Sequence, residues 1–300
     1  MIRYLKNKRG SIALVSALAV TALMGFAALV TDTGILFFNR MELSNMADAA
    51  VMAGAQDLPD TSLALQTGRL YAQRNGNATD QIYFTISGNN QIISADATRK
   101  VPTFFAKLFN IYSADVHVHA AAAIQPIAAY TGVVPLGVVK QDFVYGTTYT
   151  LKVGGGDGTT GNYGALALGG KGGSNYRDNL LYGYDGRINA GDWLYTETGN
   201  MAGPTKDGIN YRVEQDPYAT YDTVQSGSAR IIVLPVLDSF DVNGRGEVLV
   251  VGFASFFLEG ATGSGTQCTV QGKFMRTYVP EGETSDSGTG YGLYGVRLIQ

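Results

Sequence analysis

The stretch VTDTGILFFNRMELSNMADAAVMAGA, Val30–Ala55, decides the fold of the N-terminal part of the chain. It opens with a carboxylate, Asp32, directly after a long apolar run, yet it contains no strong helix breaker before Pro59. Apolar and small residues recur at spacings of three and four, as in Leu43, Met46, Ala47, Ala50 and Gly54. We therefore predict one continuous helix of about 45 residues, half in lipid and half outside.

The preceding run, Ser11–Val30, has no charged residue. At about 1.5 Å per residue it spans about 30 Å, the thickness of a bilayer core. A cleavable signal peptide is the competing interpretation, and Ala17-Leu18-Ala19 has the form of a cleavage site. Cleavage there would leave an apolar-rich segment behind, so the length favours a retained, single-pass transmembrane helix.

Charge sets the predicted orientation. The first ten residues contain no acid and four bases, Arg3, Lys6, Lys8 and Arg9. Positive flanks stay cytoplasmic, which predicts a cytoplasmic N-terminus and places residues 31–300 on the extracellular or periplasmic side of the cell membrane. We expect Asp32 at the headgroup interface; the alternative is a buried charge paired with a partner helix. Small residues recur at a spacing of four and form one stripe on the helix: Ala13, Ala17, Thr21 and Gly25. Helix dimerisation and chance explain this stripe about equally well, because Ala is common throughout the segment.

The N-terminal segment resembles the TadG-like and TadE/G-like proteins of the tight-adherence (Flp) pilus assembly system. The resemblance covers about 60 residues: the basic start with Gly10, the apolar run, Asp32 with Gly34, Arg40, ADAA at 47–50 and AGA at 53–55. It implies a component of Tad pilus assembly. Relatives processed like prepilins are cut near a Gly and carry Glu five residues later, where this chain has Val15, which favours an uncleaved anchor.

Residues 60–130 predict a small β-β-α-β subdomain on the stalk. Asp60 or Thr61 caps a helix that ends near Gly76, and Gly88-Asn89-Asn90 joins two strands as a hairpin. VPTFFAKLF predicts a helix that starts at Pro102, and ADVHVHAAAAI predicts a strand. On that strand His117, His119 and Asp115 share one face; we interpret it as a solvated face and assign no metal site.

Residues 131–300 are rich in Gly and Tyr, and short alternating apolar runs are separated by turn residues. This pattern predicts a mainly antiparallel β domain, sandwich-like or a barrel, with long loops above all at Gly154–Pro204. The predicted class is therefore α+β. The predicted domains are 1–30 (basic start and transmembrane helix), 31–130 (stalk and small α/β subdomain) and 131–300 (β-rich domain).

Several motifs in the β-rich part imitate functional sites. Gly156, Gly158 and Gly161 match a dinucleotide fingerprint without the helix that it requires. GALALGGKG fails as a phosphate loop, because Gly164 is one residue out of register with Lys171 and Gly172 replaces the hydroxyl that should bind magnesium. Four acidic residues lie in Gly- and Asn-rich loops where their carboxylates could bind calcium: Asp157, Asp178, Asp185 and Asp192. The preference of Asp, Asn and Gly for turns explains these clusters without a bound ion.

Catalytic signals are thin. Glu197 and Asp192 could act as an acid–base pair, but their spacing in the sequence alone does not support that assignment. The single cysteine, Cys268, excludes an internal disulfide framework. Trp193, in the loop Gly191–Thr205, is expected to plug a small core. We assign no catalytic, cofactor-binding or metal-binding residue and no cofactor. The net charge of −3 does not suggest a nucleic-acid binder.

We therefore expect a non-enzymatic, membrane-anchored scaffold of Tad/Flp pilus assembly. Its expected partners are the lipid bilayer and other pilus-assembly proteins, reached through the transmembrane and stalk helix; no small-molecule substrate is predicted. The alternatives are a minor pilus subunit (pseudopilin) and a membrane-tethered surface enzyme or adhesin.

Overall fold

The computed structural model describes residues 8–152, 163–199, 201–242, 244–263, 268–279, 282–285 and 290–299. The chain forms two compact units: unit 1 is Met1–Ala123 with Leu298–Gln300, and unit 2 is Ile124–Arg297. The boundary falls inside strand β3 (Ser113–Thr131), so no loop composition marks it. The described residues are α+β, with long N-terminal helices followed mainly by strands, as the sequence predicts.

Unit 1 is built on α1 (Lys8–Ala55), an uninterrupted helix of 48 residues. The prediction of one continuous helix is confirmed. Large apolar side chains from Ile12 to Val30 are exposed, whereas Leu43, Met46 and Val51 are buried. The same helix therefore has an outward-facing apolar half and a half that forms protein core.

Helix α2 (Thr61–Asn75) packs against the second half of α1. The Asp60 carboxylate accepts hydrogen bonds from the Ser62 and Leu63 amides at 3.0 Å, and Gly76 follows the helix end, so the predicted cap and stop are confirmed. Small residues let the two helices approach closely. A Cβ added at Gly54 of α1 would lie 3.6 Å from the Cα of Gly68 in α2.

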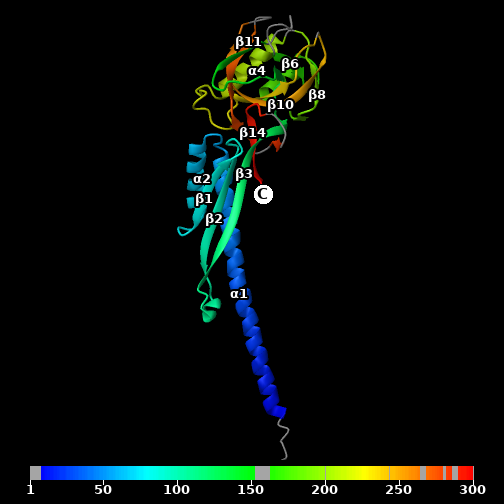
Figure 1. The fold of residues 1–300 in the computed structure, drawn as a ribbon. Helices are drawn as coiled ribbons and strands as arrows, with labels where there is room; N and C mark the ends of the chain where they lie inside the picture. Colours follow the sequence, from blue (N-terminus) through cyan, green and yellow to red (C-terminus); the bar gives the residue numbers. More distant parts are fainter. Residues whose placement is uncertain are drawn as a thin grey trace, which may run out of the picture. The chain divides into compact units, whose positions relative to one another are not determined.

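The sheet of unit 1 contains β1 (Gln81–Ser87), β2 (Ile92–Pro102) and the first part of β3, all antiparallel. The predicted hairpin is confirmed, since Gly88, Asn89 and Asn90 connect β1 and β2 with φ angles of 59°, 54° and 63°. Figure 1 shows β2 and β3 running beside α1.

The predicted helix at Pro102 is wrong. Pro102 ends β2 and pairs with Ser113, and the connection contains only a short 3₁₀ turn, η1 (Ala106–Phe109). The chain forms a strand up to Pro102 instead of a helix because the inward side chains of β2 are buried against α1. Local sequence propensity carries no information about this burial.

Unit 2 is organised around a closed ring of strands. Its main sheet has the order β5-β11-β10-β8-β6-β4-β9, and an additional pairing of β10 with β9 closes the ring. Pairing is antiparallel except between β4 and β9. The result is a barrel, one of the two architectures that the pattern predicts. The ring consists of β4 (Leu136–Val139), β6 (Tyr163–Ala167), β8 (Trp193–Thr196), β9 (Ile231–Leu237) and β10 (Glu247–Thr262), and the sheet continues from β10 to β11 (Thr269–Met275) and β5 (Thr148–Lys152).

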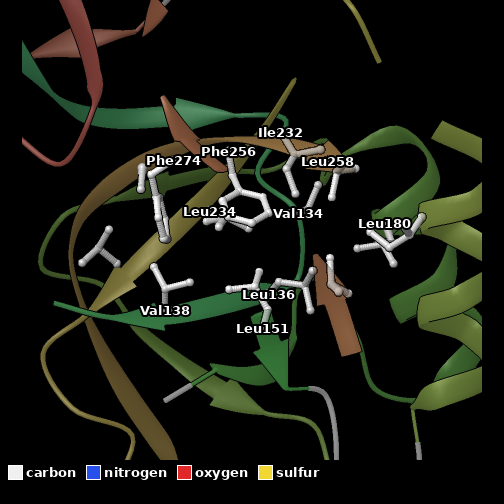
Figure 2. Packing of buried hydrophobic residues seen from close by; sticks show 14 of the residues in the cluster. Val134, Leu136, Val138, Leu151, Leu180, Ile232, Leu234, Phe256, Leu258 and Phe274 are labelled. Carbon is white, nitrogen blue, oxygen red and sulfur yellow. The ribbon is translucent and has the colours of Figure 1, made fainter. Parts of the chain in front are cut away.

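Shorter pairings complete unit 2. The end of β3 pairs with β7 (Arg187–Asn189) and β13 (Glu283–Thr284), and β12 (Thr277–Tyr278) pairs in parallel with the start of β14 (Leu293–Ile299). Figure 2 shows the barrel core, where inward side chains of several strands meet. At its centre the rings of Phe256 and Phe274 lie edge to face, with centroids 4.9 Å apart.

Within the described residues, the predicted long loop between Gly154 and Pro204 contains three strands, β6, β7 and β8, and one helix, α3 (Gly173–Tyr182). A second helix, α4 (Ala202–Gln215), begins just before Pro204. The Gly and Asn residues of α3 and α4 give both helices a low local helix propensity, so the sequence does not predict them. Tertiary packing stabilises them instead. Both bury residues in the barrel core, such as Tyr176 and Ile209.

Two buried arginines tie the irregular segments to the barrel. Arg212 donates to the carbonyls of Leu180 and Ala229, and its burial lowers the guanidinium pKa to about 10. Arg230 donates to the carbonyls of Leu258 and Ala219, at 2.9 and 2.7 Å. Each guanidinium thus satisfies backbone oxygens that the strands and helices leave open.

Gly54→Ala tests the close contact between the helices. A Cβ there would lie 2.8 Å from the Ala64 carbonyl oxygen and 2.9 Å from Ile93 Cδ1. We expect the free energy of unfolding of the full chain in detergent to fall by about 1–3 kcal/mol, because overpacking outweighs the better helix propensity of Ala. Gly34→Ala is the matched control, since a Cβ there meets nothing within 4 Å. Equal stability of the two variants in urea denaturation would contradict the contact.

Candidate functional site on the stalk helix

The candidate site is the surface along which the hairpin of β2 and β3 is fastened to the stalk, here defined as residues 31–55 of α1. Contacts occur at three levels. Ile93 lies against Gly54, Arg99 binds side chains near the middle of the stalk, and the backbone beyond Pro102 reaches Asp32. β2 therefore runs antiparallel to the stalk, and its far end points toward the apolar half of α1.

The middle level is a buried arginine. The side chain of Arg99 is 4% exposed; its Nε and Nη2 donate to the two carboxylate oxygens of Asp80, each at 2.8 Å. Its Nη1 donates to Glu42 Oε2 at 2.8 Å and to Asn39 Oδ1 at 3.2 Å. The guanidinium thus connects the sheet to two successive turns of the stalk.

Asp80 is held as a carboxylate by the same network. Burial raises the pKa of Asp80, but the hydrogen bonds from the Arg99 side chain and from the Asn77 amide outweigh burial and hold the pKa below its ordinary value of 3.8. Hydrogen bonds to Asp80 and Glu42 in turn raise the pKa of Arg99, against the effect of burial. The pair therefore stays ionised at neutral pH.

The lowest level is Asp32, whose carboxylate clasps the backbone at the end of the hairpin. Its Oδ1 accepts from the Phe104 amide at 2.7 Å, its Oδ2 accepts from the Ala106 amide at 2.7 Å, and both oxygens receive the Phe105 amide at 3.1 and 3.0 Å. Three amides that open the turn η1 are satisfied by one side chain 72 to 74 residues away in sequence. Asp32 is thus a tertiary cap in addition to marking the exit of the apolar run.

The predicted small-residue stripe is exposed along the apolar half of α1. Thr21 Oγ1 donates back to the Ala17 carbonyl at 2.9 Å, and a Cβ at Gly25 would meet nothing within 4 Å. All four residues of the stripe are exposed.

The histidines lie on the outer face of β3. His117 Nδ1 is 2.9 Å from Thr98 Oγ1, and His119 Nδ1 is 2.8 Å from Asp96 Oδ1. Asp115 shares their exposed face. Over the described part of the chain, no group of three or more His, Cys, Asp or Glu side chains is placed to hold a metal ion.

The acidic candidates of unit 2 act in turns and caps. Asp192 Oδ2 accepts from the Asn189 amide at 2.7 Å, and Glu197 Oε1 accepts from the Gly172 amide that precedes α3. Asp178 lies 3.7 Å from Arg177. Asp185 is exposed at the bend before β7.

The glycine motif spanning 156–161, together with Asp157, lies outside the described residues. Lys171 Nζ lies 5.9 Å from the centre of the Tyr195 ring, away from any phosphate-loop geometry. The thiol of Cys268 is buried, and this burial raises its pKa.

Trp193 does not plug a core, so that prediction is wrong. Trp193 is the first residue of strand β8 and is 62% exposed. Tyr195, two residues later on the same face of the strand, is 49% exposed. Strand alternation explains the difference, because Thr196 takes the buried register on the other face.

Sequence analysis missed Arg99. A signal was nevertheless present: in ISADATRKV the arginine occupies the same alternate register as Ala95, Ala97 and Val101, all buried. A charge in an inward register requires a counter-charge: Asp80 is buried together with Arg99, and Glu42 pairs with it from a more exposed position on the stalk.

The region that carries this site is also the region that matches a known family. Residues 10–57 match the family described as putative Flp pilus-assembly TadE/G-like. Over these residues the chain is similar to that family. The match covers α1 and supports involvement in pilus assembly, while all of unit 2 lies outside it. Neither the curated proteins nor the solved structures gave a match.

Helix α1, which carries the match, also has the properties of a membrane span. Among the described residues it is the one helix long and apolar enough to cross a bilayer, and none of its apolar window is buried. Exposure of this kind is unfavourable in water and favourable in lipid.

Arg99→Met is expected to lower the free energy of unfolding by about 3–5 kcal/mol, because the buried Asp80 carboxylate loses its counter-charge. Lys100→Met, an exposed neighbour on the same strand, is the control and should change stability by less than about 0.5 kcal/mol. Adding Asp80→Leu to Arg99→Met should recover part of the loss. Denaturant unfolding of the four proteins measures these differences, and equal effects of the two Met variants would refute the network.

Acid should weaken the same network. The pKa of Asp80 is lower in the folded protein than in the unfolded chain, so its contribution to stability is complete above the ordinary pKa of 3.8 and is lost as pH falls through the lowered value. We expect the difference in unfolding free energy between the native chain and Asp80→Asn to shrink between about pH 5 and about pH 2. A difference that stays constant over this range would show that Asp80 is not the titrating group.

Proposed function

We propose that this protein is a membrane-anchored, non-enzymatic component of Tad/Flp pilus assembly that acts as an envelope anchor or scaffold. One observation carries the proposal. The segment that matches the TadE/G-like family is a single helix whose first half exposes apolar side chains and whose second half is the core of unit 1. The exported mass is therefore continuous with its anchor, with no linker between them.

The contacts along the stalk suit a mechanical role. Arg99 and Asp32 fasten the hairpin to the helix at two levels, and Gly54 allows close packing at a third. A load applied to the hairpin would be distributed along the stalk instead of acting on one turn. A scaffold needs this property, and a flexibly tethered enzyme does not.

The stalk also offers a surface to other pilus-assembly proteins. Phe37, Phe38 and Met41 are 67%, 56% and 50% exposed. Apolar side chains that remain exposed on a helix are typical of contact surfaces. The basic start supports a cytoplasmic N-terminus, with residues 31–300 on the other side of the membrane.

The polar residues that the sequence offers as catalytic candidates make contacts within the fold. His117, His119, Asp192 and Glu197 each bind a side chain or amide of the fold. Of these contacts, only that between Thr98 and His117 joins a hydroxyl to an imidazole, and no contact of the described residues supplies the third group that would orient this imidazole for nucleophilic catalysis.

The test uses a tagged full-length chain in cells that make Flp pili. We expect the protein to stay in membranes through alkaline carbonate extraction, to keep its residues before Val30, and to be required for piliation. A variant with Phe37→Glu and Phe38→Glu should lose piliation while remaining in the membrane, whereas Tyr83→Glu, at an exposed position on β1, should not.

Three results would overturn the proposal. Release by carbonate with a mature end beyond residue 30 would remove the anchor. Cleavage after Gly10 and recovery in sheared pili would favour the minor pilus subunit. Normal piliation without the protein would remove the role in assembly.

A further inference from the structure

The end of the hairpin carries an exposed apolar cluster that the scaffold role does not explain. We define the tip as residues 103–112, TFFAKLFNIY, which contain no acid and one base, Lys107. Its exposed apolar side chains are Phe104 (65%), Leu108 (80%), Phe109 (79%), Ile111 (53%) and Tyr112 (64%). Such a concentration in ten residues marks a contact surface.

The tip is an ordered structure. The Thr103 amide donates to the Tyr112 carbonyl at 3.1 Å, which closes the tip, and the Ile111 amide donates to the Ala106 carbonyl at 3.2 Å. Asn110 takes a left-handed conformation with φ 62°. The apolar side chains are therefore presented by a fixed backbone.

Asp32 fixes the level of this cluster relative to the apolar span. The carboxylate that binds the amides of Phe104 to Ala106 lies two residues after Val30, a rise of about 3 Å along the helix. A bilayer of about 40–45 Å has a hydrocarbon core of about 30 Å, so each headgroup layer is about 5–7 Å thick. The tip is thus held at the depth of the outer headgroups.

The direction of the hairpin agrees with this placement. From Gly54 to Asp32 the helix rises about 33 Å, and from Ile93 to Phe104 the strand rises about 36 Å. The strand therefore spans the whole stalk and brings its end, not its side, to the membrane exit.

We propose that the tip inserts its apolar side chains into the outer leaflet of the same bilayer that α1 crosses. The chain would then meet the membrane twice, by the span and by the tip. Phe, Leu and Tyr suit the boundary between headgroups and acyl chains, and Lys107 suits lipid phosphate. The inference rests on the proposed membrane anchor and goes beyond it.

The test uses full-length protein in nanodiscs of phosphatidylcholine and phosphatidylglycerol, with or without bromine on the acyl chains. Trp193, exposed on β8, is replaced by Phe, and single tryptophans are introduced by Phe109→Trp, Tyr83→Trp and Phe26→Trp. Tyr83 is the matched control, because it is 69% exposed and pairs with Asp96, about 26 Å along the strand from Phe104.

We expect brominated lipid to quench Phe109→Trp by at least about half of the quenching seen for Phe26→Trp, and to leave Tyr83→Trp unquenched. Adding Leu108→Asp to the Phe109→Trp reporter should reduce the quenching several-fold, because a charge resists insertion. Asn89→Asp, which adds the same charge at the opposite turn of β2, should not change it.

Each other outcome has a definite meaning. No quenching of Phe26→Trp would overturn the anchor itself. Quenching of Phe26→Trp but not of Phe109→Trp would overturn the inference alone. A tip tryptophan shielded from both lipid bromine and aqueous acrylamide would show that a protein covers the tip. Quenching that survives Leu108→Asp would also refute apolar insertion.

Discussion

Everything in unit 1 depends on one helix that stays intact while its surroundings change. A bilayer core offers no water to satisfy backbone amides, so a spanning segment must satisfy them internally, and α1 does so for 48 residues without a break. Only the side chains change along the way. The apolar residues up to Val30 face outward, and those from Leu43 onward are buried by α2 and the sheet.

This continuity sets the dimensions of the hairpin. A strand that runs antiparallel to the stalk from Gly54 to Asp32 must be about as long as that stretch of helix, and β2 is. The contacts at Gly54 and Asp32 hold the two ends of β2 against the stalk. Between them Arg99 faces inward from the strand, and its charge network joins the middle of β2 to the stalk. The network makes the hairpin and stalk one body, on which both the scaffold role and the placement of the tip depend.

Unit 2 follows different rules. Its strands close into a ring, so most strand edges are paired, and its core is filled by side chains from several strands (Figure 2). Two of the acidic residues considered as catalytic candidates, Asp192 and Glu197, accept hydrogen bonds from backbone amides there. The polar residues are thus used to build the turns of a Gly-rich domain.

The sequence by itself determined the features that depend on neighbours along the chain: the continuous helix, the Asp60 cap, the turn at Gly88–Asn90 and the α+β class. These follow from periodicity, capping and turn chemistry, which act over a few residues. Tertiary structure alone decided that Pro102 ends a strand, that α3 and α4 form, and that Trp193 faces solvent. It also decided what Asp32 and Arg99 bind. The reason is distance along the chain: Asp32 caps amides 72 to 74 residues away, and Arg99 meets Glu42 across 57 residues. Local propensity carries no information about such partners, which the fold alone brings together.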